Sequence, residues 1–365
     1  MDREELGAWL RLLETPRVGR ESARRLLAAF GSAQAVISAS SSARGQVVGA
    51  AQANALASAP DSLGALLAVT CDWLGDESGA PRAVIPLGDP RYPRLLLEAA
   101  DPPLLFYAQG RFELLQAEGI AVVGSRNPTP QGVENAKAFA SQLAGAGLTV
   151  VSGLALGIDT AAHEGALEGP ASTVAVVGTG LDRVYPSRNL KLAHRIASTG
   201  LIISEYPLGT PPLPLHFPPR NRIIAGLTRG TLVVEAALRS GSLITARLAS
   251  EAGRDVFAIP GSIHSPQSQG CHALIKQGAK LVESAQDILD ELQGGPTSRQ
   301  TALPLEDTPA NPLLDAMGED PVTLDALMAR TGEAAATLLA RLLELELDGR
   351  VARLPGGLYQ QRHVG

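Results

Sequence analysis

Short runs of apolar residues alternate with amphipathic stretches through the middle of the chain, and most of the runs are bounded by glycine. The runs are IAVVG (120–124), LTVVSG (148–153), STVAVVG (172–178), GLIIS (200–204), TLVVE (231–235) and DVFAIPG (255–261). Helical stretches such as VENAKAFASQLAGAG and LITARLASEAG separate most of them. Strands that are apolar throughout and alternate with helices form parallel sheets covered on both faces. Residues 82–291 are therefore predicted to form a Rossmann-like, doubly wound α/β domain.

The two ends of the chain have other patterns. The pattern of residues 1–75 predicts short helices. A Val-Gly pair precedes a predicted helix at 18–19 and again at 48–49, as in helix-hairpin-helix units. Such a unit either binds phosphates through its glycine turn or is only a small helical packing domain. Residues 292–312 include a Gly- and Pro-rich stretch without periodicity, which predicts a linker. Residues 313–365 predict three helices and a hairpin, the order of a winged helix.

The third helix of that winged helix is acidic. Residues 333–349 contain Glu333, Glu344, Glu346 and Asp348 but only one arginine, Arg341, which sums to -3. Phosphates repel such a helix, so this domain is expected to dock a protein rather than read a DNA groove.

Composition narrows the class of protein. The 365 residues are 45% hydrophobic and 19% charged with a net charge of -6, which excludes a globally basic nucleic-acid binder but not a local basic patch. Two cysteines 200 positions apart and six histidines without an i,i+4 pair predict no metal site, and no cofactor is expected. The start MDREELGAWL is unlike a signal peptide and no apolar run reaches 18 residues, so a cytoplasmic protein without membrane contact is expected.

Candidate chemistry lies where the predicted strands end, because open α/β sheets bind ligands at their carboxyl edge. Glycine turns, hydroxyl groups and arginines follow several strands, as suits phosphate binding at helix N-termini. These candidates are Gly124, Ser125, Arg126, Gly153, Arg183, Arg188, Ser240, Gly241 and Ser242.

The segment HFPPRNRIIAGLTR (216–229) carries three arginines and no acid. Phe217 offers an aromatic face for a base, while Arg220, Asn221 and Arg222 offer donors for phosphates, the combination a single-stranded nucleic-acid groove needs. His163 suggests catalysis, but without a group to orient it a structural role is expected. Asp159 is expected to cap the helix that follows it, and Tyr185 is expected to pack. Glu235 is a candidate general base, but no nucleophile or second carboxylate accompanies it.

The blocks GSRNPTPQG, SGLALGIDTAAH, GTGLDRVYPSRN, ISEYPLG, HFPPRNRIIAGL, VVEAALRSGSLITARLA and FAIPGS occur in the order typical of one family. On these motifs the chain resembles the DprA family, also called Smf, over residues 86–290. The N-terminal helices resemble the sterile-alpha-motif-like domain of longer members, and the C-terminal segment resembles their winged helix.

The resemblance implies a recombination mediator without enzymatic activity. Such proteins bind incoming single-stranded DNA during natural transformation, help displace single-strand-binding protein and load the RecA recombinase. It also implies DNA contacts by Arg126 and Phe217, with Arg220 and Arg222 beside them. A homodimer is implied too, through the surface near GCHALIKQGAKLVES, where we expect contacts at Leu274 and Ile275 beside the unusual pair Cys271-His272.

Two other functions remain open at this point. The Gly/Ser turn and Glu235 also resemble nucleoside-monophosphate phosphoribohydrolases of the lysine-decarboxylase-like type, although their PGGxGTxxE signature is absent. A winged-helix regulator of duplex DNA is the other alternative, and the acidic third helix counts against it.

Overall fold

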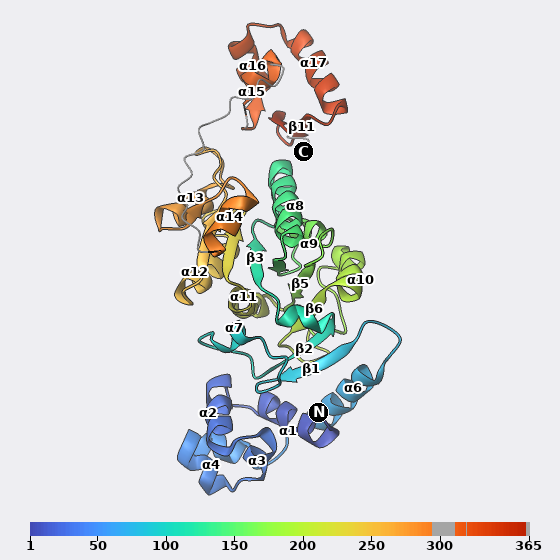
Figure 1. Cartoon of the computed structure of the whole chain (residues 1–365), viewed down its shortest axis with the longest axis vertical. Helices are drawn as coiled ribbons and strands as arrows, with labels where there is room; N and C mark the ends of the chain where they lie inside the picture. Colours follow the sequence, from blue (N-terminus) through green and yellow to red (C-terminus); the bar gives the residue numbers. More distant parts are fainter. Residues whose placement is uncertain (294–310, 319, 363–365) are drawn as a thin grey trace.

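The computed structural model describes residues 1–293, 311–318 and 320–362, in an N-terminal helical part, a central α/β part and a C-terminal winged helix (Figure 1). Most of the predicted linker lies outside the described residues, as does His363. No helix in the described ranges is both long and apolar enough to span a bilayer.

The centre is one nine-stranded sheet in the order β1-β2-β6-β5-β4-β3-β7-β8-β9. All six predicted strands are present and parallel to one another. The strands are β1 (Arg82–Pro86), β2 (Leu105–Gly110), β3 (Gly119–Val123), β4 (Thr149–Ser152), β5 (Thr173–Val176), β6 (Leu201–Ser204), β7 (Gly230–Val233), β8 (Asp255–Ala258) and β9 (Lys280–Leu281).

Three strands of this sheet were not predicted. β1 and β2 form an antiparallel pair that attaches to β6, also antiparallel, and β9 extends the other edge in parallel. The predicted all-parallel sheet is thus corrected to a mostly parallel sheet with an antiparallel edge. The Rossmann-like fold class itself is confirmed.

Helices cover both faces of the sheet, because the buried strands alternate their apolar side chains between two cores. Ala121 and Val123 of β3 join the core beneath α7, α11, α12 and α13, whereas Ile120 and Val122 join the core beneath α8, α9 and α14. α10 covers β5 and β6. The bounds are α7 (Arg94–Leu97), α8 (Pro130–Gly145), α9 (Ile158–Ala166), α10 (Leu190–Thr199), α11 (Phe217–Gly226), α12 (Ser242–Glu251), α13 (Gln269–Lys276) and α14 (Ala285–Leu292).

The strand order reverses between β3 and β7. From β3 the chain proceeds through β4 and β5 to β6 on one side, then returns to place β7 and β8 on the other side of β3. The loops that leave β3 and β7 therefore diverge and open a crevice at the carboxyl edge, which is the general ligand position in such sheets.

Six N-terminal helices pack against the antiparallel edge. Trp9 and Leu10 share a core with Leu105 and Tyr107 of β2, and the Thr70 and Tyr107 hydroxyl groups are 3.2 Å apart. The helical part is therefore fastened to the sheet by apolar burial. Its helices are α1 (Arg3–Glu14), α2 (Arg20–Phe30), α3 (Ala33–Ser38), α4 (Ser41–Val48), α5 (Ala50–Ala55) and α6 (Leu63–Gly75).

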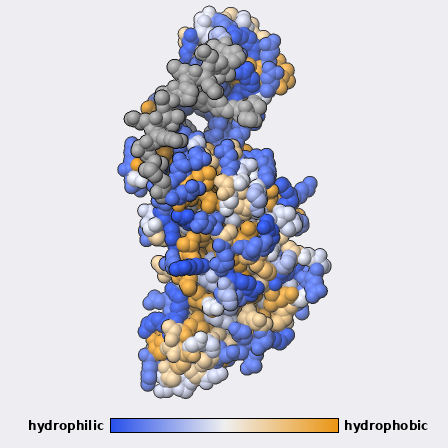
Figure 2. Space-filling model, in the orientation of Figure 1, coloured by the Kyte–Doolittle hydropathy of each residue, from blue (hydrophilic) through white to orange (hydrophobic). Residues whose placement is uncertain are grey.

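The C-terminal part has the predicted winged-helix order, with one further short strand. It contains α15 (Pro312–Met317), β10 (Val322–Thr323), α16 (Leu324–Thr331), α17 (Ala335–Leu347), β11 (Val351–Leu354) and β12 (Leu358–Gln361). Leu339, Leu343 and Leu347 are exposed on α17, and Figure 2 shows hydrophobic side chains on the outer side of this domain.

Candidate nucleic-acid interface

A pocket of about 650 Å³ occupies the crevice between the loops that follow β3 and β7. Cationic, aromatic and hydroxyl side chains line it together. The principal lining residues are Ser125, Arg126, Tyr185, Phe217, Arg220, Asn221, Arg239, Ser240, Gly241 and Ser242.

The loop after β3 presents Arg126 at the mouth of the pocket. The Ser125 hydroxyl accepts a hydrogen bond from the Asn127 amide at 3.1 Å, which fixes the turn and leaves Arg126 exposed. Gly124 packs closely against protein, since a Cβ at that position would lie 2.7 Å from Ile158. The glycine predicted for phosphate approach therefore serves packing as well.

An aromatic pair forms one wall. The Tyr185 and Phe217 rings are stacked with centroids 5.7 Å apart, and the Arg126 guanidinium lies 5.6 Å from the Phe217 centroid. Tyr185 is 48% exposed, so its expected packing role is corrected: its ring is open to solvent at the pocket. The sequence signal for this position was an aromatic residue three positions before Arg188.

The loop after β7 completes the pocket from the opposite side. α12 begins at Ser242, the Ser240 and Ser242 hydroxyl groups are 2.7 Å apart, and the Asn221 side chain donates to the Gly241 carbonyl at 3.4 Å. Arg239 stands exposed beside this turn. Hydroxyl groups, a helix N-terminus and an unburied arginine thus face the exposed Arg126 across the crevice.

Arg220 lines the pocket but is held mainly by protein. Arg220 is 5% exposed, and its guanidinium donates to the carbonyl groups of Gly153, which follows β4, and Val176, which ends β5. Burial lowers the pKa of Arg220 to about 10. A Cβ on Gly153 would meet this guanidinium, so Gly153 makes room for Arg220 and lies outside the pocket lining.

Asp159 was expected to cap the helix that follows it. Instead its carboxylate accepts hydrogen bonds from the backbone amides of Gly153 and Ala155, at N···O distances of 3.1 and 3.2 Å. The side chain therefore stabilises the loop before the helix. Residue 159 already lies in the first turn of α9, where its own side chain points back toward β4. Burial raises the pKa of Asp159, against the opposing effect of Arg220.

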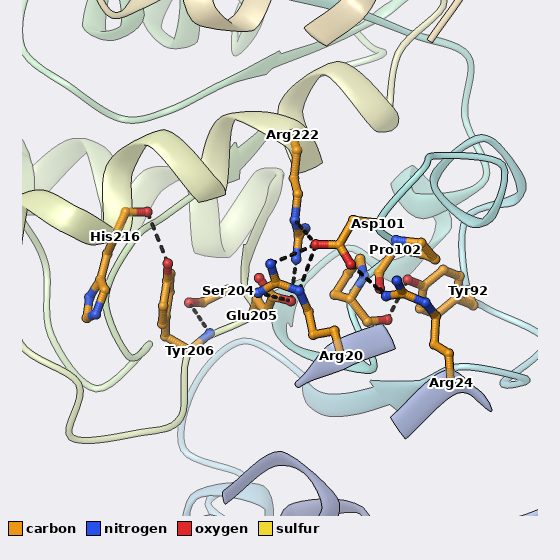
Figure 3. A network of polar contacts seen from close by, with 11 residues as sticks. Arg20, Arg24, Tyr92, Asp101, Pro102, Ser204, Glu205, Tyr206, His216 and Arg222 are labelled. Atoms are coloured by element: carbon orange, nitrogen blue, oxygen red, sulfur yellow. Dashed lines mark hydrogen bonds and ion pairs between the residues drawn. The ribbon is translucent and has the colours of Figure 1, made fainter. Parts of the chain in front are cut away.

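Arg222 does not reach the pocket. It points away from it, into a network between α11, the α7–β2 loop and α2 (Figure 3). Its guanidinium contacts Glu205 at 2.5 Å and Asp101 at 3.2 Å, and Asp101 also pairs with Arg20 and Arg24.

Arg183 and Arg188 are also absent from the pocket lining. Arg183 is exposed and pairs with Asp182 at 3.0 Å. Arg188 is exposed on the short helix η2 (Ser187–Asn189), where no described residue binds its guanidinium. Both arginines therefore stand outside the pocket, available to solvent.

The two groups considered for catalysis serve the fold. His163 is fully buried beside Thr173, with Nδ1 2.7 Å from the hydroxyl oxygen, and burial lowers its pKa to about 3. Glu235 accepts hydrogen bonds from the amide and hydroxyl of Thr129, the N-cap of α8, while burial raises its pKa. No group of three or more metal-ligating side chains occurs in the part of the chain that the structure describes.

The predicted dimer residues lie on a different surface. Leu274 and Ile275 of α13 are half-buried against the sheet core, and Leu274 lines a groove of about 710 Å³ between α12 and α13. Cys271 is buried beneath them, and His272 Nε2 lies 2.9 Å from the Gly261 carbonyl oxygen. Cys271 therefore belongs to the core rather than to the surface.

The fold and the pocket define a Rossmann-like protein whose switch-point crevice combines arginine, aromatic and hydroxyl groups. Comparisons with known proteins identify its family. A family model described as DNA recombination-mediator protein A matches residues 83–293. A model of a DprA-like N-terminal HHH domain matches residues 3–61, and a model of a DprA winged helix domain matches residues 296–357. The chain therefore belongs to the DNA recombination-mediator protein A family, known as DprA or Smf.

Individual relatives agree. Protein Smf of Escherichia coli is 42% identical over 296 residues, covering 77% of this chain and 78% of the relative. The crystal structure of DprA from Streptococcus pneumoniae is similar with a TM-score of 0.68 and 38% identity, covering 80% of this chain and 98% of that one. A structure of DprA from Helicobacter pylori that concerns its single-stranded DNA binding mode matches with a TM-score of 0.54 and 31% identity, covering 60% and 99%.

Proposed function

We propose that this chain is a recombination mediator that binds single-stranded DNA in the switch-point pocket. In this proposal it acts in the cytoplasm during natural transformation, by binding rather than by catalysis. It protects incoming strands, helps displace single-strand-binding protein and loads the RecA recombinase.

The observation that carries the proposal is the stack of Arg126, Phe217 and Tyr185 at the pocket mouth. A base placed on these rings gains stacking energy whatever its identity, about 1–3 kcal/mol per base in single-strand binders. The guanidinium of Arg126 forms no ion pair with another described residue, so it is available to a phosphate. A pocket with both groups suits a strand whose bases are unpaired.

Family membership supports the same function. The family model describes a recombination mediator, and the Helicobacter pylori relative is a protein with a single-stranded DNA binding mode. That relative shares the fold at 31% identity, so we expect its ligand class to apply to this pocket.

The test is a titration of fluorescent oligo-dT and of the matching duplex, read by anisotropy at several salt concentrations. We expect tight, salt-sensitive binding of the single strand, a loss of about 5- to 150-fold in Phe217→Ala, and a salt slope reduced by about 0.7 in Arg126→Ala. The matched control is Arg111→Ala, because Arg111 follows β2 at the opposite edge of the sheet and pairs with Glu113.

Equal affinity for the duplex, or pocket variants that bind like the Arg111→Ala control, would sink the proposal. A second assay measures whether the protein releases the base from nucleoside monophosphates. Turnover that depends on Glu235 would favour the phosphoribohydrolase alternative.

We further propose that the chain dimerises through the α12–α13 surface. This surface has a groove and exposed apolar side chains, with Leu238 59% and Leu281 46% exposed. Two pockets on one strand would raise affinity by avidity. Leu281→Lys is expected to shift the mass in light scattering toward the monomer, and an unchanged dimer in both Leu281→Lys and Leu238→Lys contradicts this surface.

A further inference from the structure

A row of exposed basic side chains runs from the pocket rim along α10. Arg188 lies on η2, and Lys191, His194 and Arg195 follow on α10; all four are exposed. Lys191 and Arg195 are four residues apart and therefore neighbours on one face of the helix. We call these four residues the α10 ridge.

The ridge has no acidic counterpart. Between Arg183 and Ser204 the sequence contains no Asp or Glu, in a chain whose net charge is -6. Among the described residues, no carboxylate forms an ion pair with a ridge side chain, and Glu168, in the turn after the adjacent α9, is paired with Lys137 at 2.9 Å. Like charges four residues apart destabilise a helix slightly, and an anionic ligand would relieve that repulsion.

The ridge begins at the pocket. Tyr185, stacked on Phe217 in the pocket wall, precedes it by three residues. The Asn189 side chain donates to the Leu154 carbonyl at 2.9 Å and to that of Ala155, which lines the pocket. α10 connects the parallel strands β5 and β6, so its N-terminus lies at the carboxyl edge where the pocket opens.

We propose that the α10 ridge is a second nucleic-acid contact that binds the phosphate backbone of a single strand as it leaves the pocket across Tyr185. The ridge offers mainly cationic groups and contains no Phe, Tyr or Trp, so it contributes affinity without base preference. This inference rests on the proposed function, because the pocket must hold the strand for the ridge to extend its path.

Strand length separates the two sites. The experiment compares a short oligo-dT that fills only the pocket with one several times longer, for wild type, the pocket variant Arg126→Ala and the ridge double variant Lys191→Gln/Arg195→Gln. Glutamine keeps helix propensity, and circular dichroism checks that each variant folds. The matched control removes two positive charges elsewhere, Arg3→Gln/Arg94→Gln, both exposed.

For the long strand, two lost phosphate contacts should lower the salt slope by about 1.4. If affinities converge at 1 M salt, this is a loss of about 25-fold at 0.1 M. The short strand should bind the ridge variant as it binds wild type.

A ridge variant that matches the charge control on the long strand overturns the inference. Failure of Arg126→Ala to weaken the short strand would instead count against the pocket, so the two failures can be told apart.

Discussion

The network around Glu205 is predicted to fasten the N-terminal helices to the central domain. Glu205 is 5% exposed, lies 2.5 Å from Arg222 of α11 and 3.6 Å from Arg20 of α2, and shares both partners with Asp101 (Figure 3). Glu205→Gln removes the carboxylate charge while keeping the shape of the side chain. Arg222, only 13% exposed, then loses its shorter ion pair.

Breaking a buried ion pair by removing one partner typically costs about 3–5 kcal/mol. Arg222 keeps Asp101 at 3.2 Å and Arg20 is 37% exposed, so the lower end applies. We expect Glu205→Gln to lower the free energy of unfolding by about 3 kcal/mol. Glu113→Gln is the surface control, because Glu113 is 64% exposed and its pair with Arg111 is worth about 1 kcal/mol at most.

The assay is urea unfolding followed by two signals. Both tryptophans, Trp9 and Trp73, lie in the N-terminal helices, so their fluorescence reports that part of the chain while circular dichroism reports all of it. A second variant, Glu205→Gln/Arg222→Gln, removes the unpaired charge and should recover part of the loss. A Glu205→Gln protein as stable as Glu113→Gln would refute this account of the network.

Three further predictions concern the pocket and its support. Burial lowers the pKa of His163 to about 3, below its unfolded value of about 6.5. The stability that the neutral ring contributes is therefore complete above pH 6.5, and it declines by up to about 1.4 kcal/mol per pH unit as the pH falls toward 3. His163→Leu should flatten this part of the plot of stability against pH, and an unchanged plot would contradict the prediction. Gly153→Ala should lower the free energy of unfolding by about 1–3 kcal/mol in denaturant titrations, because the new Cβ would displace the Arg220 guanidinium. A variant as stable as wild type would show that Arg220 can move aside without cost. Tyr185→Ala should weaken oligo-dT binding by about 1–3 kcal/mol while Tyr185→Phe binds normally; equal binding by both would show that the Phe217 wall acts alone.

The six parallel strands from β3 to β8 could be predicted because each is a short apolar run followed by a turn. β1 and β2 are equally apolar, RAVIP and LFYAQG, but only the four-residue helix α7 lies between them. An apolar run by itself does not say whether its neighbour is parallel or antiparallel. The direction of β2 depends on pairing with β6, almost a hundred residues later, and no local pattern carries that information.

Some of the candidate binding residues could be predicted from the sequence and others could not. Arg126, Phe217 and the Ser240–Ser242 turn lie at the pocket because they follow strand ends or begin helices, which sequence position alone reveals. Tyr185 was expected to pack, because nothing in the local sequence distinguishes an aromatic side chain that packs from one that is exposed. Its exposure depends on how the loop after β5 folds over the edge, a tertiary property.

The pair Arg220 and Arg222 shows where sequence reasoning had information that it did not use. Both belong to α11, and residues two apart on an α-helix differ by about 200° in direction, so they face opposite sides. Once the segment is recognised as helical, only one of the two arginines can face the pocket. In the structure Arg220 faces it and clamps the ends of β4 and β5, whereas Arg222 reaches Glu205 and Asp101 on the other side. The helix that begins at Phe217 is thus held on both sides by arginines that bond to protein, so the position of the aromatic wall depends on Arg222, which lies outside the pocket, as well as on Arg220, which lines it.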